Sequence, residues 1–153
     1  GVLFLIPVPR LFFRLIFGEM HIILFKSQKV SSEKIQSIDL ATKVLEANEN
    51  WDNELITYQE AKDEFAKFIQ DTQQFVNTVT EPGPPSTFAG LVKSHEELKS
   101  IAELIFADTE ELLEGLTSSD TGERRSAALE SFNNNMNEFQ EKIDEIVATN
   151  TSG

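Results

Sequence analysis

An almost wholly apolar segment opens this chain, and a strongly acidic remainder follows it. The first 25 residues read GVLFLIPVPRLFFRLIFGEMHIILF. Residues 1–34 carry five basic and two acidic groups, a net charge of +3, whereas residues 35–153 carry eight basic and 24 acidic groups, a net charge of −16. Because water disfavours the first part and solvates the second, the apolar part must be covered by lipid, by a partner or by the chain's own helices.

The spacing of residues 9–25 predicts an amphipathic helix. At about 100° per residue, Arg10, Arg14 and His21 fall on one narrow stripe, and apolar residues cover most of the remaining surface. Pro7 and Pro9 exclude a regular helix before about residue 10, and the charges within the run are unlike a membrane-spanning helix. Such a helix is typical of a membrane interface or of a groove in a larger assembly. The predicted membrane- or partner-binding residues are Arg10, Leu11, Phe12, Phe13, Arg14, Leu15, Ile16, Phe17 and Phe25.

Three alternatives remain for this segment. In the first it packs into the protein's own core as a further helix. In the second it is the remnant of a targeting signal or anchor, although the basic start and the small-residue cleavage site of a secretory signal are not seen. In the third, a β-hairpin turns at Gly18 and Glu19.

Beyond Lys26 the apolar residues recur at three- and four-residue steps, the pattern of amphipathic helices. A first helix starts near Ser31 or Ser32 and ends at Asn48-Glu49-Asn50, and its predicted buried stripe is Ile35, Ile38, Ala41, Thr42 and Leu45. A second helix runs from Trp51 until Pro82-Gly83-Pro84-Pro85 ends it, and its stripe is Trp51, Leu55, Tyr58, Lys62, Phe65, Ile69, Thr72, Val76 and Val79.

Two further helices follow. One starts near Ser86 or at the capping box Ser94-His95-Glu96-Glu97, and its predicted buried face is Leu98, Ile101, Ala102, Ile105, Thr109, Leu112 and Leu116. After a turn at residues 117–122, with Asp120 and Glu123 as a box-like start, the last helix has the stripe Leu129, Phe132, Met136, Phe139, Ile143 and Ile146.

Short connections place neighbouring helices antiparallel. The sequence therefore predicts an all-α fold, an up-and-down antiparallel bundle of three long helices plus one shorter helix, to which the apolar N-terminal segment is added. The expected organisation is an apolar, weakly basic segment at 1–26, an acidic helical bundle at 27–150 and a frayed tail at 151–153.

The residue types indicate no catalytic chemistry. The chain has no cysteine, which excludes disulfides, thiolate zinc sites and cysteine nucleophiles. Its two histidines, His21 and His95, do not form a catalytic relay or a Glu-x-x-His metal motif, and His95 is interpreted as a first-turn or seam residue. We predict no enzyme activity, no catalytic residue, no metal site and no cofactor.

Charge and polarity then give the functional hypotheses. A net charge of −13 argues against nucleic-acid binding. The favoured hypothesis is a non-enzymatic helical interaction or structural protein, anchored through its N-terminus to membrane lipid or to a protein partner within a multi-subunit complex. The alternative is a helical-bundle carrier of lipid or another apolar ligand. Homo-oligomers through exposed apolar helix faces, and a membrane-associated or else secreted location, are further expectations.

Overall fold

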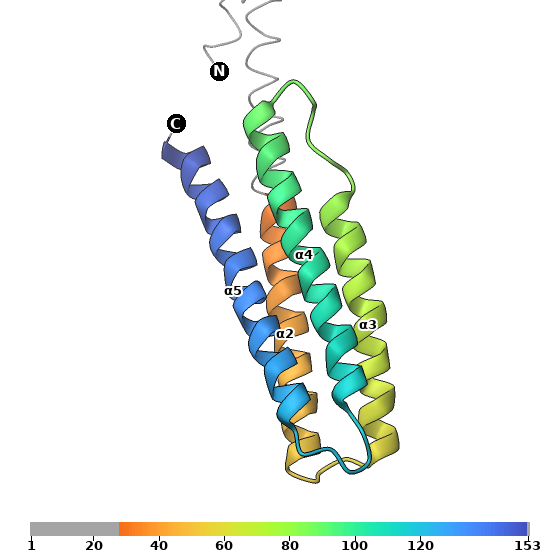
Figure 1. Cartoon of the computed structure of the whole chain (residues 1–153). Helices are drawn as coiled ribbons and strands as arrows, with labels where there is room; N and C mark the ends of the chain where they lie inside the picture. Colours follow the sequence, from red (N-terminus) through yellow and green to blue (C-terminus); the bar gives the residue numbers. More distant parts are fainter. Residues whose placement is uncertain (1–27, 153) are drawn as a thin grey trace, which may run out of the picture.

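Four long helices form an up-and-down bundle in the computed structural model, which describes residues 28–152. They are α2 (Val30–Asp52), α3 (Tyr58–Thr80), α4 (Ala89–Gly115) and α5 (Glu123–Ser152). Each packs against its neighbours in chain order, and α2 also packs against α5, which closes the bundle (Figure 1). The predicted all-α, up-and-down architecture is confirmed, and the apolar segment at 1–26 lies outside the described residues.

All four helices contribute to the core, and α4 and α5 do so through the faces predicted for them. Every residue of the stripe predicted over 98–116 is buried, and so are the residues predicted for α5 apart from the partly buried Leu129. The rings of Phe75 on α3 and Phe139 on α5 meet edge to face, with centroids 5.1 Å apart. Three- and four-residue spacing of mostly apolar residues was therefore a sufficient guide for these two helices.

The second helix starts later than the sequence predicted. Residues 53–57 form a turn, and α3 begins at Tyr58 rather than at Trp51. Thr57 is its N-cap: the Thr57 hydroxyl accepts from the Glu60 N–H at 3.1 Å, and the Glu60 carboxylate accepts from the Thr57 N–H at 3.2 Å. This capping box satisfies two backbone donors that a helix start leaves unpaired. Leu55, expected on the buried stripe, is exposed in the turn.

The buried face predicted for the first helix is wrong. Ile35, Ile38 and Leu45 are exposed, and the core-facing side of α2 carries Leu40, Val44 and Ala47 instead. Three polar residues share that buried side, Glu33, Ser37 and Asn48. Because Ser37 and Asn48 find partners on α5 and Glu33 accepts a hydrogen bond from Lys29, the burial of α2 does not follow its apolar periodicity.

The length of this helix also differs from the prediction. α2 continues through Asn48-Glu49-Asn50 to Asp52, so the bundle has four long helices rather than three long and one shorter. The break was expected because asparagine disfavours helix interiors, but the Asn48 side chain is held inside the bundle by Arg125 on α5.

The remaining helix boundaries lie near their predicted positions. α4 begins at Ala89, so Ser94 lies within the helix and does not cap it. Asp120 lies three residues before the start of α5 at Glu123, and its carboxylate accepts hydrogen bonds from the Arg125 side chain and from the Thr117 N–H. α5 runs to Ser152, so the tail expected at 151–153 falls in its last turn and on Gly153, outside the described residues.

Candidate functional site

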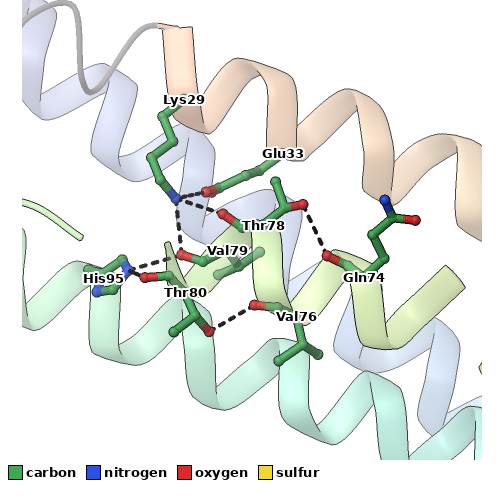
Figure 2. A network of polar contacts seen from close by, with 8 residues as sticks. All are labelled: Lys29, Glu33, Gln74, Val76, Thr78, Val79, Thr80 and His95. Carbon is green, nitrogen blue, oxygen red and sulfur yellow. Dashed lines mark hydrogen bonds and ion pairs between the residues drawn. The ribbon is translucent and has the colours of Figure 1, made fainter. Parts of the chain in front are cut away.

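A polar cluster lies at the end of the bundle where the chain enters α2. It comprises Lys29, Glu33 and His95 with the last carbonyl groups of α3, and we call it the Lys29–His95 cluster (Figure 2). The start of α2, the end of α3 and the early part of α4 each supply part of it. It therefore lies directly beside the point from which the predicted N-terminal segment continues.

The Lys29 ammonium caps the C-terminal end of α3. Its Nζ donates to the carbonyl oxygens of Thr78 and Val79, both at 3.0 Å, and to the Glu33 carboxylate at 2.5 Å. The last carbonyl groups of a helix lack partners within that helix and carry partial negative charge. A cation supplied by the start of α2 satisfies two of them and so connects α2 to α3.

His95, in the first turns of α4, caps the same helix end. Its Nε2 lies 2.9 Å from the Val79 carbonyl oxygen and 3.0 Å from that of Thr80. Both partners are acceptors, so Nε2 must carry the hydrogen and donate it. Gly83 in the loop after α3 lies against the imidazole, since a side chain at that position would start 3.5 Å from the ring. His95 is thus a residue of the α3–α4 contact.

Glu33 is the member of the cluster whose hydrogen bonding is incomplete. Its side chain is buried, Oε1 accepts from Lys29, and Oε2 has no hydrogen-bond partner among the described residues. Burial raises the pKa of this carboxyl above its ordinary value, and the hydrogen bond and charge of Lys29 together with the charge of His95 offset only part of that effect. An unsatisfied buried acceptor of this kind costs about 1–3 kcal/mol.

The space beside Glu33 is too small for a substrate. A cavity of about 10 Å³ adjoins the cluster, which is room for about one water molecule. Its lining is Lys29, Val30, Glu33, Leu91, Ser94, His95, Leu98 and Ile146. The arrangement is suited to capping α3 and fixing the entry of the chain into the bundle.

Two larger hollows follow one another along the boundary between α2 and α3. Their volumes are about 230 and 250 Å³, and both are lined by Lys43, Lys67 and Asp71. Phe75 contributes to one and Phe68 to the other, but the rims are charged. An apolar ligand in such a groove would remove charged side chains from water, which is costly.

Neither a metal centre nor a membrane span is found in the part of the chain that the structure describes. Across residues 28–152, no group of three or more His, Asp or Glu side chains is placed to hold a metal ion. Within the same residues, no helix combines the length and apolar character that crossing a bilayer requires.

The nine residues predicted to bind a membrane or partner all lie outside the described residues. They are Arg10, Leu11, Phe12, Phe13, Arg14, Leu15, Ile16, Phe17 and Phe25. Sequence reasoning did not find the Lys29–His95 cluster, for which the only local signal was the i, i+4 spacing of Lys29 and Glu33. Comparison with protein-family models, with curated proteins and with solved structures finds no match for this chain.

Proposed function

We propose that this protein is a non-enzymatic helical interaction protein that attaches to a membrane surface through its N-terminal segment. The observation that carries the proposal is the division of the sequence into an apolar segment with a basic stripe and an acidic remainder. A broad Phe, Leu and Ile face buries itself in the acyl boundary, and Arg10 and Arg14 are attracted to anionic headgroups. The acidic bundle stays in water.

The charge distribution of the bundle supports an orientation in which the end where the chain enters α2 faces the membrane. The half that lies at the entry of the chain consists of residues 28–41, 70–102 and 138–152, with five Lys or Arg against ten Asp or Glu, a net charge of −5. The other half, residues 42–69 and 103–137, has five against 15, a net charge of −10. An anionic membrane would therefore repel the far half more strongly than the entry half.

The bundle is long enough to keep its more acidic half beyond the range of the membrane's surface charge. α4 has 27 residues, which corresponds to about 40 Å of helix, whereas the field of a charged surface falls off within about 8–10 Å at physiological ionic strength. A bundle attached by its entry end keeps its most acidic end beyond that range. Lys29 donates hydrogen bonds to two carbonyls of α3, which connects the start of α2 to the bundle where the N-terminal segment joins it.

Flotation of the full chain with liposomes that contain phosphatidylserine tests the proposal. We expect the unchanged chain to float, and the variant Phe12→Glu, Phe17→Glu to remain at the bottom of the gradient. The matched control is Leu55→Glu, Leu104→Glu, which places the same charge on exposed apolar positions of the bundle and should float like the unchanged chain.

The other outcomes separate the competing hypotheses. A full chain that stays monomeric and soluble without lipid, and does not float, contradicts attachment. A chain that needs detergent yet does not float contradicts a lipid target and indicates a protein assembly. Stoichiometric binding of an apolar fluorescent probe that fatty acid displaces, without flotation, would replace the proposal by the carrier.

A further inference from the structure

A row of exposed apolar side chains runs along the outer side of α2. Ile35 is 68% exposed, Ile38 46% and Leu45 38%, and Thr42, which is also exposed, lies between the last two. We call these four residues the α2 seam. Their steps of three, four and three are those of the a and d positions of two consecutive heptads, the spacing by which two helices pack at a shallow angle.

The α2 seam is suited to contact with another apolar surface. It lies on the side of the helix away from Leu40 and Val44, which face the core. The Thr42 hydroxyl donates to the Ile38 carbonyl at 2.9 Å. Because this hydroxyl is satisfied within its own helix, covering Thr42 leaves no unpaired polar group and presents its methyl group to the partner.

The charged residues beside the seam discriminate between partner orientations. In heptad terms Asp39 and Glu46 take e positions, and Lys34 takes the g position before them. Two parallel copies of α2 place Lys34 of each opposite Asp39 of the other, an attractive pair. Two antiparallel copies place Asp39 opposite Glu46, a repulsive pair. Charge complementarity therefore favours the parallel arrangement.

The ion pairs that Lys34 and Asp39 form within one chain do not prevent them from pairing with a second copy. Lys34 pairs with Asp144 of α5 at 2.7 Å, and Asp39 pairs with Lys43 at 3.0 Å. All four side chains are more than a third exposed, and ion pairs at such surfaces add little to the stability of the fold. Replacing them by a pair between copies costs little.

We propose that the α2 seam binds a second copy of this chain in a parallel, two-fold symmetric dimer. The symmetry axis runs alongside α2, so both chains enter their bundles at the same end and both N-terminal segments continue from that end. The consequence for attachment rests on the proposed function: two weak membrane contacts on one particle hold it far more firmly than one.

The expected strength of the dimer follows from its size and charge. Three large apolar side chains per copy make a short interface compared with those of stable complexes, and the described bundles, each with a net charge of −15, repel one another. We therefore expect weak association in dilute solution. On a bilayer the attached bundles share one surface and one orientation, which raises their effective concentration.

Cysteine cross-linking of the full chain on liposomes tests the interface, because the native chain has no cysteine. Ile38→Cys places a thiol at a d position next to its symmetry mate. Leu104→Cys on α4 is the matched control, since Leu104 is 52% exposed and lies outside the seam. Under mild oxidation we expect severalfold more covalent dimer from Ile38→Cys than from Leu104→Cys. Equal yields from the two variants would overturn the dimer.

A mixing experiment tests the orientation. In the parallel dimer Ile35→Cys and Leu45→Cys each form disulfides with their own kind, and a mixture of the two gives the mixed disulfide only at the level of the Leu104→Cys control. A dominant mixed disulfide would overturn the parallel arrangement. Flotation of the reduced variants reports on membrane attachment separately: flotation without Ile38→Cys cross-linking contradicts the dimer alone, and cross-linking without flotation contradicts the proposed function alone.

Discussion

Asn48 and Arg125 lie 77 residues apart in the sequence, yet Arg125 Nη1 donates a hydrogen bond of 2.8 Å to the side-chain oxygen of Asn48 inside the bundle. The same guanidinium donates from Nη2 to Asp120 at 2.7 Å and approaches Asp52 at 2.9 Å. Two carboxylates and one amide thus surround a buried cation that joins the end of α2, the α4–α5 turn and the start of α5.

The two adjacent arginines should respond very differently to the same substitution. The Arg125 side chain is 4% exposed, whereas Arg124 is 54% exposed and pairs with Glu111 and Glu114 at the surface. Removing one partner of a buried ion pair leaves an uncompensated charge, so Arg125→Met should lower the free energy of unfolding by about 3 kcal/mol. Arg124→Met should lower it by less than about 1 kcal/mol.

Urea unfolding followed by circular dichroism measures both changes. Arg125→Lys is a useful third variant, because lysine keeps the charge but cannot reproduce the fork of hydrogen bonds, and we expect an intermediate loss. Equal losses for the Arg124 and Arg125 variants would contradict the buried role of Arg125.

Leu40 and Ile38 test which side of α2 faces the core. Leu40→Ala removes a buried side chain and should cost about 2–5 kcal/mol in the free energy of unfolding. Ile38→Ala truncates a side chain that is 46% exposed, and its cost should be much smaller, about 0.5 kcal/mol. Thermal and urea unfolding of the two variants provide the comparison. A larger loss for Ile38→Ala would mean that the helix is rotated about its axis relative to this structure.

Glu33 gives a pH-dependent prediction. Its pKa in the folded protein is raised because burial disfavours the carboxylate, and Lys29 and His95 only partly oppose this. Stability from such a group is complete below its unfolded-state pKa, about 4.3, and is lost as the pH rises through the folded-state pKa. Glu33→Gln abolishes this titration. The stability of the variant relative to the unchanged protein should therefore increase as the pH rises from about 4 towards neutrality.

Glu97 is a control for which the pH dependence of stability has the opposite sign. A hydrogen bond from Lys142 lowers the pKa of the Glu97 carboxyl, with burial opposing this and the charge of Lys142 adding to it. A carboxyl with a lowered pKa stabilises the fold above its unfolded-state pKa and loses that contribution as the pH falls. The relative stability of Glu97→Gln should thus decrease as the pH rises. Urea unfolding at a series of pH values measures both variants, and trends of the same sign would refute the assignment.

The accuracy of the sequence predictions differed from helix to helix for a physical reason. Over 129–146 the large apolar residues recur without interruption, and over 98–116 Thr109 is the only polar residue of the stripe; the structure buries both stripes with only Leu129 partly exposed. In α2 the same periodicity selected Ile35 and Ile38, which are exposed. Two core positions of α2 are occupied by Ser37 and Asn48, whose partners Gln140 and Arg125 are on α5.

The Lys29–His95 cluster could not be predicted from the sequence, because its partners also come from distant parts of the chain. Lys29 and Glu33 are four residues apart, but the carbonyl groups that Lys29 binds lie 49 and 50 residues further along, and His95 binds one of the same carbonyls. Backbone carbonyls have no signature in the sequence. Only the packing of α2 and α4 against the end of α3 brings the three elements together.

By itself the sequence determined the helical class, the antiparallel order imposed by short connections, and the division between an apolar segment and an acidic bundle. Apolar spacing and charge are properties of the chain that hold in any arrangement of its helices. The tertiary structure alone decided which side of α2 faces the core, that α2 passes through Asn48, and which groups cap α3. Each of these depends on a polar group whose burial is favourable only because a distant residue is placed to bind it.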